Sequence, residues 1–327
     1  MKAIVYQRYG SPDVLECADI EKPLPGANEV SIRVRAAAAN PLDWHFMRGE
    51  PYVMRMATGL REPKARRLGV DVAGDVDAVG ANVTRFKPGE AVFGVCRGAF
   101  AENACTPESA LVLKPREVSY AQAAAVPIAA ITALQGLRDK GRIQSGQRVL
   151  INGAAGGVGT FAVQIARVLG AEVTGVCSGR NVEMVRALDA DHVIDYTRES
   201  FTDSTQQYDL LLDCVGNHPL LTCRRVLNPK GAYVIVGGSG GPWLGPLPRS
   251  IMAATLSLFV SQQFCTALAK QNEEDLEILR DLMATGKLSP VIDRRYRLSE
   301  VPEAIRYLET GHARGKVVID VDRGDEA

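Results

Sequence analysis

The pattern of apolar and polar residues changes near residue 119 and predicts two kinds of architecture. Before that point, short apolar stretches rich in β-favouring residues recur at 3–6, 30–39, 70–80 and 91–96. Gly and Pro separate these stretches, as in the segments LPGANE and RFKPGE. Short runs bounded by turn residues are typical of strands, so we expect a compact, mostly antiparallel β domain in this part of the chain.

Two segments interrupt this pattern. In residues 47–67 the apolar residues follow neither a helical nor a strand period, and the segment ends in basic residues. We expect a long loop of the kind that often lies over a binding site. Residues 121–137 form the longest uncharged stretch, which is shorter than the ~20 apolar residues that a membrane-spanning helix needs. We therefore expect a buried helix there and no membrane span. The first apolar run breaks at Gln7 and Arg8, so no signal-peptide core is expected either.

Apolar strands alternate with helical stretches from residue 119 onward. Strand-like segments lie at 148–152, 172–177, 192–196, 209–216 and 232–238. Short strands joined by single helices form βαβ crossovers, which predict an α/β fold with a parallel, doubly wound Rossmann sheet. Residues 255–263 have the length and composition of one more strand.

We expect the last part of the chain, from residue 269, to return to the β domain, because it no longer alternates short apolar strands with single helices. It holds an amphipathic helix that begins at Glu273 and ends near Gly286, and a closing strand at 316–321. The expected organisation is a first domain of residues 1–118 and 269–327, with a nucleotide-binding domain of residues 119–268 inserted in it.

Composition and charge narrow the function classes. The chain has 327 residues, and its 38 Lys and Arg balance 38 Asp and Glu, which excludes a nucleic-acid protein held mainly by bulk charge. Hydrophobic residues at 46% and charged residues at 23% exclude a disordered or collagen-like chain. The seven Cys form no C-x-x-C pair, so a disulfide scaffold is not expected and a reducing compartment, the cytoplasm, fits best.

A glycine-rich turn follows the strand at 148–152 and carries the strongest chemical signal. The segment NGAAGGVG leads into a stretch with one apolar face at helical spacing. Free backbone N–H groups at such a helix start bind a pyrophosphate, and the candidate contacts are Gly153, Ala155, Gly156, Gly157 and Val158. Ala154 replaces the first glycine of G-x-G-x-x-G, so the turn taken alone is about as typical of a purely structural turn as of a nucleotide site. Its position between a strand and a helix favours a dinucleotide site.

The end of the next strand bears on which dinucleotide binds. Folds that prefer NAD usually place an acid there for the ribose 2′-OH, and this chain has Ser178 and Arg180 instead. A hydroxyl and a guanidinium bind a 2′-phosphate, so NADPH is favoured over NADH. The alternative is that Arg180 is a solvated charge at a helix start, where the helix dipole disfavours it.

Several motifs, spread over essentially the whole chain, match those of one protein family and occur in the same order. These are Asn40-Pro41-Leu42-Asp43 followed by Met47-Arg48-Gly49, then Leu68 to Gly74, then Val126-Pro127 with Ile131 to Leu134, and the turn from Gly153 to Gly159. The chain resembles the medium-chain dehydrogenase/reductase superfamily, within it the zinc-independent quinone oxidoreductase-like branch. This resemblance implies a Rossmann NADP-binding domain inserted in a GroES-like catalytic domain.

Zinc-containing members of the superfamily need Cys and His ligands that this chain lacks. Asn40 stands at the first ligand position, and the G-H-E segment reads Gly69-Val70-Asp71. Amide and valine side chains do not replace thiolate and imidazole, so no metal is expected. His45 remains at its family position, and without a metal or a hydroxyl relay we expect a structural histidine.

The resemblance also implies further site residues. It places Asn40 and Tyr52 near the nicotinamide as candidate catalytic residues, with Asn40 and Thr132 holding the cofactor. Asn40 could equally cap the turn before Pro41. Other implied cofactor contacts are Tyr196, Val215, Gly216, Gly237, Gly238, Ser239 and Lys316. Open α/β sheets bind ligands at their strand ends, which independently supports Val215 and Gly237.

The lost zinc ligands favour reduction of an electrophilic acceptor. Without a Lewis acid to stabilise an alkoxide, a quinone or an α,β-unsaturated carbonyl is a better substrate than an alcohol. Two alternatives remain, an alcohol or aldehyde dehydrogenase with bound metal, and an NADPH-binding interaction protein without turnover. An unpaired apolar edge at 255–263 also predicts a homodimer.

Overall fold

The computed structural model describes residues 1–238 and 241–321. The chain divides into two compact units, Met1–Ala129 with Gln271–Ala327, and Ala130–Lys270. The sequence placed the first boundary at 118/119. Residues 119–129 group with the first unit instead, because helix α3 (Tyr120–Ala124) packs against strands β3 (Glu29–Ala39) and β4 (Asp71–Val79).

The first unit is built on a seven-stranded sheet. Its order is β14-β15-β3-β4-β5-β7, with β6 also pairing with β3, and all pairs are antiparallel except β14 with β15. The remaining strands are β5 (Ala91–Val95), β6 (Asn103–Pro107), β7 (Leu111–Leu113), β14 (Ile292–Arg297) and β15 (Lys316–Asp320), and β1 (Lys2–Val5) pairs separately with β2 (Glu16–Asp19). The prediction of a mostly antiparallel β domain is therefore confirmed.

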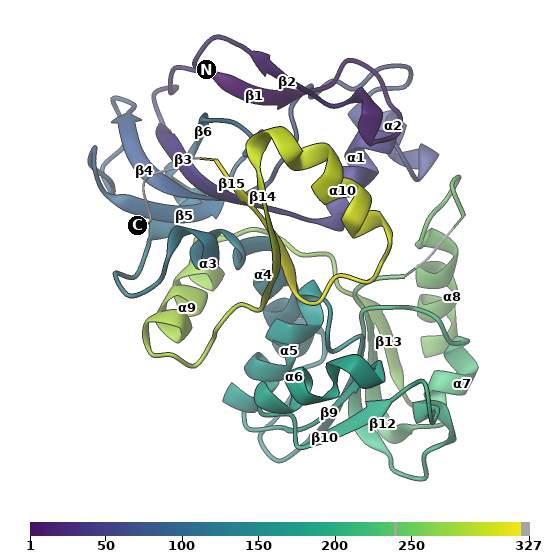
Figure 1. Ribbon diagram of the computed structural model, residues 1–327. Helices are drawn as coiled ribbons and strands as arrows, with labels where there is room; N and C mark the ends of the chain where they lie inside the picture. The colour runs from purple at the N-terminus through teal and green to yellow at the C-terminus, as the bar shows by residue number, and fades with distance from the viewer. Residues whose placement is uncertain (239–240, 322–327) are drawn as a thin grey trace. The chain divides into compact units, whose positions relative to one another are not determined.

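The C-terminal tail completes this first unit, as the sequence predicted. β15 pairs with the end of β3, where Val318 lies opposite Ala38 (Figure 1). Helix α10 (Val301–Glu309) packs on the same sheet through Val301, Ala304 and Ile305. Helix α9 (Glu273–Ala284) contacts β7.

Two local predictions in the first half were wrong. The expected loop at 47–67 contains short helices: α1 (Pro41–Arg48) extends into it, followed by η2 (Tyr52–Met54) and α2 (Arg55–Thr58). The guanidinium of Arg55 lies over the rings of Tyr9 and Tyr52, at 4.5 and 4.6 Å, and such side-chain contacts leave no periodicity in the sequence.

The expected single helix at 121–137 is also broken. α3 ends before Val126, and α4 (Pro127–Gln135) begins with a proline, which has no N–H to continue a preceding helix; a π-helical turn (Gly136–Lys140) follows. Within the described residues, every helix is too short or too polar to span a bilayer.

The second unit is a six-stranded parallel sheet in the order β10-β9-β8-β11-β12-β13. Its strands are β8 (Arg148–Asn152), β9 (Glu172–Cys177), β10 (His192–Asp195), β11 (Tyr208–Asp213), β12 (Leu227–Ile235) and β13 (Gln263–Thr266). Its main helices are α5 (Gly157–Val168), α6 (Val182–Ala187), α7 (Leu220–Arg224) and α8 (Leu247–Ser257).

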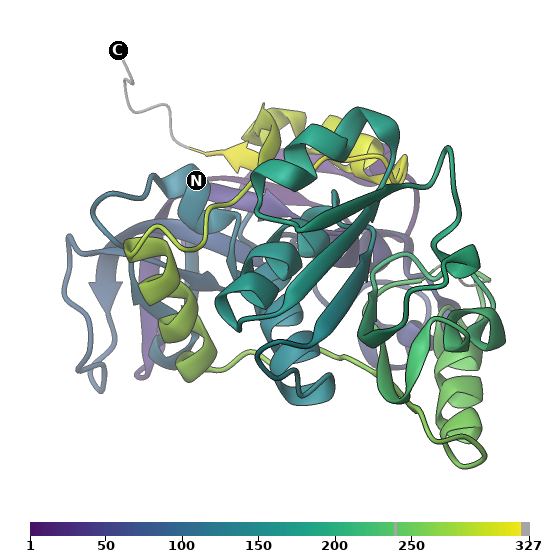
Figure 2. The same cartoon turned by 90° about the horizontal axis from the view of Figure 1, so that it is seen from below.

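Helices cover both faces of this sheet (Figures 1 and 2). Leu150, Leu211 and Tyr233 stand side by side on adjacent strands and share a core cluster with residues of α7 and α8. Gly175, one residue out of phase with them, faces Val185 of α6. The prediction of a doubly wound sheet is confirmed. The strand order changes direction at β8, which is the point where such sheets bind ligands.

The prediction of a strand at 255–263 was wrong. Its first three residues end α8, and the last strand, β13, begins only at Gln263. The hydroxyl of Ser257 accepts from the N–H of Phe264 at 2.6 Å and donates to its carbonyl at 3.1 Å, which ties the end of α8 to β13. Tertiary contacts thus outweigh the β-favouring composition of the segment.

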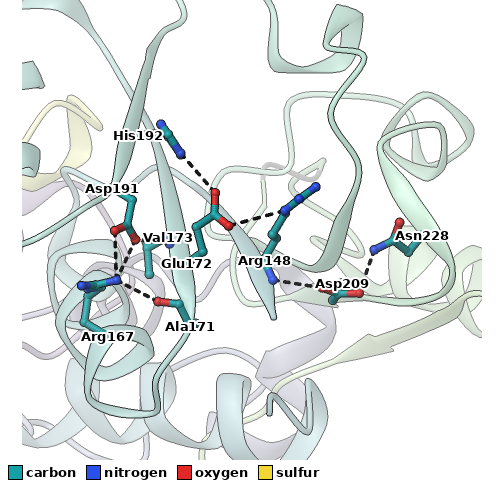
Figure 3. A network of polar contacts seen from close by, with 9 residues as sticks. All are labelled: Arg148, Arg167, Ala171, Glu172, Val173, Asp191, His192, Asp209 and Asn228. Atoms are coloured by element: carbon teal, nitrogen blue, oxygen red, sulfur yellow. Dashed lines mark hydrogen bonds and ion pairs between the residues drawn. The ribbon is translucent and has the colours of Figure 1, made fainter. Parts of the chain in front are cut away.

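Polar side chains fix the amino ends of the parallel strands (Figure 3). The backbone N–H of Arg148 donates to Asp209 at 2.9 Å, and the same carboxylate accepts from the Asn228 amide at 2.7 Å. Asp191 accepts from the N–H of Val173 at 2.7 Å and from the guanidinium of Arg167. These contacts occupy one edge of the sheet and leave the opposite edge, at the carboxyl ends, for a ligand.

Candidate functional site

The glycine turn joins the central strand β8 to helix α5. Gly153 has a φ of +84°, a left-handed conformation that glycine adopts without strain. The N-cap of α5 is Gly156, so no cap side chain accepts from the first N–H groups of the helix. The N–H groups of Gly153 and Gly156 donate to the carbonyls of Val176 and Gly153, at 3.2 and 3.0 Å. The donors that face the switch point of the sheet are therefore those of the first turn of α5, together with the positive end of the helix dipole.

The glycines of this turn differ in the space around them. A Cβ on Gly159 would lie 2.0 Å from the carbonyl oxygen of Gly153, so the helix packs directly against the turn there. For a Cβ on Gly156, the one contact within 4 Å among the described residues beyond its chain neighbours is the same oxygen, at 3.4 Å. The surroundings of Gly156 thus leave room for a ligand, while Gly159 is needed for packing.

The turn after β9 brings Ser178, Arg180 and Asn181 together. A 3₁₀ helix (Gly179–Asn181) follows Ser178, which is half-buried, and Arg180 is exposed. The amide of Asn181 is 6% exposed, and its Nδ2 donates to Ser178 Oγ at 3.2 Å. Asn181 gave no signal in the sequence, because only the turn geometry directs its side chain at Ser178.

An acid lies beside this turn although none follows β9 directly. Asp195 ends the neighbouring strand β10, and its Oδ2 lies 2.7 Å from where a Cβ on Gly179 would be. The Thr197 hydroxyl, at 2.7 Å from Oδ1, holds the pKa of Asp195 below its usual value. The carboxylate is therefore ionised and contributes a negative charge next to Ser178 and Arg180.

The loop after β11 is organised by Asp213. Its Oδ1 accepts from the N–H groups of Val215 and Gly216, at 3.1 and 2.8 Å, and from the Asn152 amide at 2.8 Å. The N–H groups of Val215 and Gly216 are thus used within the protein. An acid at the end of the apolar run DLLLD was the available sequence signal for this role.

A second set of contacts secures Asp213 from the other side. Its Oδ2 accepts from the hydroxyl of Tyr233 and pairs with Arg249 of α8, at 3.3 Å. The Arg249 guanidinium also donates to the Tyr233 hydroxyl, and burial raises the pKa of that phenol. This arrangement ties β11, β12 and α8 together beneath the loop.

The strand ends hold most of the remaining predicted contacts. A Cβ on Gly237 would lie 2.5 Å from the carbonyl of Cys214, whereas one on Gly238 would lie 3.9 Å from Gly216. Tyr196 follows β10 and is exposed. Thr132 lies in α4, and the predicted contact Ser239 falls outside the described residues.

In the first unit, Asn40, Asp71 and Lys316 form a buried group that we call the Lys316 cluster. Lys316 Nζ is 2.5 Å from Asn40 Oδ1 and 3.3 Å from Asp71 Oδ2, and the Asn40 Nδ2 donates to Asp71 at 3.0 Å and to the Ala38 carbonyl at 3.2 Å. The Lys316 and Asp71 side chains are 3% and 0% exposed. The pairing of β15 with β3 and of β3 with β4 brings these distant positions together.

This cluster changes the roles predicted for Asn40 and Lys316. Both amide hydrogens and the carbonyl oxygen of Asn40 have partners inside the protein, so the side chain has no donor left for a reacting acceptor. Asn40 is also the N-cap residue of α1, where its N–H donates to the Asp43 carboxylate at 2.7 Å and its backbone carbonyl accepts from the Asp43 N–H at 3.0 Å. The Lys316 ammonium is likewise bound by Asn40 and Asp71.

Asp43 and His45, on α1, have structural partners. Asp43 accepts from the N–H groups of Asn40 and Gly69, at 2.7 and 3.1 Å, and burial raises its pKa to about 7. His45 Nδ1 lies 2.8 Å from the Glu50 carbonyl, and its ring stacks on Trp44. Tyr52, the second candidate catalytic residue, is half-buried in η2 under the Arg55 guanidinium.

Comparisons with known proteins show which family the chain belongs to. Residues 26–116 match the model of the alcohol dehydrogenase GroES-like domain, and residues 188–319 match that of zinc-binding dehydrogenases. A chloroplast envelope quinone oxidoreductase homolog of Arabidopsis thaliana is 33% identical, with 98% of both chains covered. The chain belongs to the medium-chain dehydrogenase/reductase superfamily, in its quinone oxidoreductase-like branch.

Two further members of this superfamily are similar over most of the chain. An NADPH-dependent alkenal/one oxidoreductase of Arabidopsis thaliana is 33% identical, covering 98% of this chain and 79% of its own. The structure of a quinone oxidoreductase from Coxiella burnetii superposes with a TM-score of 0.87 at 30% identity, covering 98% of this chain and 99% of its own.

The description of one matching model raises the question of zinc, and this superfamily member's residues do not fit the ion. Zinc prefers thiolate and imidazole ligands, and the corresponding positions hold Asn40 and Val70. The Asn40 oxygen already accepts from Lys316, so a divalent cation there would face a buried ammonium. Across residues 1–238 and 241–321, no group of three or more His, Cys, Asp or Glu side chains could hold a metal.

Proposed function

We propose that this protein is an NADPH-dependent oxidoreductase that reduces a quinone or an α,β-unsaturated carbonyl without zinc. The observation that carries the proposal is the glycine turn at the switch point of the sheet, next to a strand end with Ser178 and Arg180 in place of an acid. Relatives named as a quinone oxidoreductase homolog and as an NADPH-dependent alkenal/one oxidoreductase support the same chemistry.

The second unit has the features that NADPH requires. Free N–H groups at the start of α5, with open space at Gly156, receive the pyrophosphate. Ser178 and Arg180 bind the 2′-phosphate through a hydroxyl and a charge-assisted pair. Gly216 follows β11 and Gly238 follows β12, so both lie at the carboxyl ends of two neighbouring strands. When bound there, NADPH supplies the hydride for the reduction.

The chain's own contribution to the reaction is binding, orientation and exclusion of water. The acceptor's conjugated carbonyl spreads the negative charge that hydride addition creates, so neither a metal nor a strong general acid is required of the protein. The amide of Asn40 is used internally, which leaves Tyr52 as the candidate side chain to donate a hydrogen bond to the acceptor. The Lys316 cluster supports the absence of zinc, because its ammonium supplies the positive charge at Asn40.

Steady-state kinetics test this proposal directly. We expect NADPH oxidation with a panel of quinones and enones, with kcat/KM for NADPH exceeding that for NADH, and no stoichiometric zinc by elemental analysis. Equal or better use of NADH overturns the cofactor assignment. One zinc per chain together with alcohol oxidation favours a dehydrogenase, and tight NADPH binding without turnover favours an interaction protein.

The second unit also supports a homodimer, with β13 rather than residues 255–263 as the edge. β13 is the last strand of the sheet, and the adjacent helix α8 and its flanking segments expose apolar side chains. These residues are Trp243, Leu244, Leu247, Ile251, Met252, Leu258 and Phe259. An apolar helix face continuous with an open strand edge is typical of a surface covered by a second copy.

Light scattering after size-exclusion chromatography tests the dimer. We expect a dimer at micromolar concentration and a shift towards monomer for Ile251→Glu. Leu24→Glu is the matched control, since Leu24 is an exposed apolar residue of the first unit. A wild-type monomer, or an equal effect of both variants, contradicts the assignment.

The seven cysteines, all free in the structure, also support a reducing compartment, for which we propose the cytoplasm.

A further inference from the structure

We propose that Asn181 directs the Ser178 hydroxyl towards the 2′-phosphate and so acts as a positioning residue for NADPH selectivity. The inference rests on the proposed function above and deepens its cofactor site. Asn181 itself is not the phosphate ligand. It acts through the hydroxyl of Ser178.

The geometry of the turn fixes the contact between the two side chains. Asn181 is 6% exposed, and its Nδ2 lies 3.2 Å from Ser178 Oγ. Its backbone N–H donates to the Ser178 carbonyl at 2.8 Å, which closes the turn and holds the amide against the hydroxyl. Asn181 also stands at the start of α6, whose first residue is Val182.

The chemistry of the contact determines where the serine hydrogen points. The NH₂ group of an asparagine only donates, whereas a serine hydroxyl has one hydrogen and two lone pairs. Because Asn181 occupies a lone pair of Ser178, the single hydroxyl hydrogen is free for another acceptor. A phosphate offers only acceptor oxygens, so a serine that donates outward matches a 2′-phosphate.

The donation from Nδ2 to Ser178 places the other end of the amide, Oδ1, in a buried position. Among the residues that the structure describes, no hydrogen-bond donor reaches the buried Asn181 Oδ1. Leaving a buried carbonyl oxygen unpaired costs free energy, and such a group in a native structure calls for an explanation. In the reverse orientation, Oδ1 would accept the Ser178 hydrogen and remove the donor that the phosphate needs.

Two substitutions test this role, read out by calorimetric binding of 2′,5′-ADP and 5′-AMP and by kcat/KM for NADPH and NADH. In Asn181→Asp a carboxylate accepts the serine hydrogen, and we expect the preference for 2′,5′-ADP over 5′-AMP to fall by about tenfold to a hundredfold. In Asn181→Leu the hydroxyl is only released, and we expect a smaller loss, about three- to tenfold.

A charge control and a double-mutant cycle make the test specific. Gln207→Glu adds the same charge at an exposed position before β11, and should leave the preference unchanged. In a Ser178→Ala background, Asn181→Leu should cause no further loss of the preference. An equal loss in both backgrounds shows that Asn181 does not act through Ser178 and overturns the inference.

The outcomes separate this inference from the proposed function. A wild-type protein that binds 5′-AMP as tightly as 2′,5′-ADP contradicts the NADPH assignment itself. A wild-type protein that discriminates, while Asn181→Leu and Asn181→Asp discriminate equally well, contradicts only the role of Asn181. Should Asn181→Asp fail to fold, the leucine variant and the double-mutant cycle decide the question.

Discussion

Asp195 is the residue whose charge works against the proposed 2′-phosphate site. Its carboxylate lies beside Gly179, between Ser178 and Arg180 in the chain, and the Thr197 hydrogen bond keeps it ionised. A negative charge at this position repels a phosphate and tolerates a ribose hydroxyl. We therefore expect the preference for NADPH to depend on a balance between Arg180 and Asp195.

We predict that Asp195→Asn increases the preference for NADPH. The asparagine keeps an oxygen that accepts from Thr197 and removes the charge, so the Kd for NADPH should fall by about two- to fivefold at low ionic strength, and by less in high salt. Fluorescence titration with NADPH and NADH measures this. Asp203→Asn, at an exposed carboxylate in the same unit, should leave both affinities unchanged. An unaltered NADPH affinity in Asp195→Asn would remove Asp195 from the selectivity balance.

At this scale, the sequence identified residues by their chemistry but not by their partners. Ser178 and Arg180 could be chosen because the missing acid is visible in the chain. Asn181 and Asp195 could not, because one is an unremarkable helix-start residue and the other ends a different strand. Their relevance follows from a turn geometry and a strand register that the sequence does not display.

At the scale of elements, the start of α5 separates a packing glycine from a binding glycine. Gly159→Ala would place a methyl group 2.0 Å from the Gly153 carbonyl, so the helix must move. We expect a loss of about 2–4 kcal/mol in the free energy of unfolding, measured by urea denaturation.

The matched substitution Gly156→Ala should have the opposite pattern. Its backbone φ of −85° suits alanine, and the methyl group would lie 3.4 Å from the Gly153 carbonyl oxygen, an ordinary van der Waals distance. We expect stability within about 0.5 kcal/mol of the wild type and at least about tenfold weaker NADPH binding, because the methyl group occupies the space left for the pyrophosphate. Unchanged NADPH affinity would place the pyrophosphate elsewhere.

Elements with a strong local pattern were predicted well from the sequence. The strands at 30–39 and 148–152 and the helix after the glycine turn agree with β3, β8 and α5. The segment 255–263 was assigned wrongly, because its apolar side chains are equally compatible with an exposed helix face, and only the contact between Ser257 and Phe264 shows where the helix ends.

At the scale of the whole molecule, the buried carboxyl of Asp43 links folding stability to pH. Its pKa is raised to about 7 in the folded protein, from an ordinary value of 3.8. Between these values the native carboxyl keeps a proton that the unfolded chain has released. The free energy of unfolding therefore falls as pH rises from about 4 to about 7, by at most about 1.4 kcal/mol per pH unit.

We predict that Asp43→Asn flattens this dependence. An asparagine cannot titrate, so the difference in unfolding free energy between variant and wild type should change steadily across this pH range. Urea denaturation at several pH values measures the difference, and a constant difference would show that Asp43 does not titrate there. Asp19→Asn is a control, because Asp19 is an exposed carboxylate with a lowered pKa.

The sequence by itself determined the fold class, the glycine turn and which residues stand where the resemblance places the family's zinc ligands. These features are local. Apolar periodicity sets strands and helices, and the glycines of a turn lie within a few residues of each other. The identity of a single residue, such as Asn40 in place of a thiolate, does not depend on how the chain folds. Only the tertiary structure decided that Asn40 binds Lys316 and Asp71, because strand pairing joins positions that are 31 and 276 residues apart from Asn40. Hydrogen-bond partners and burial depend on such long-range pairing, which local patterns do not encode.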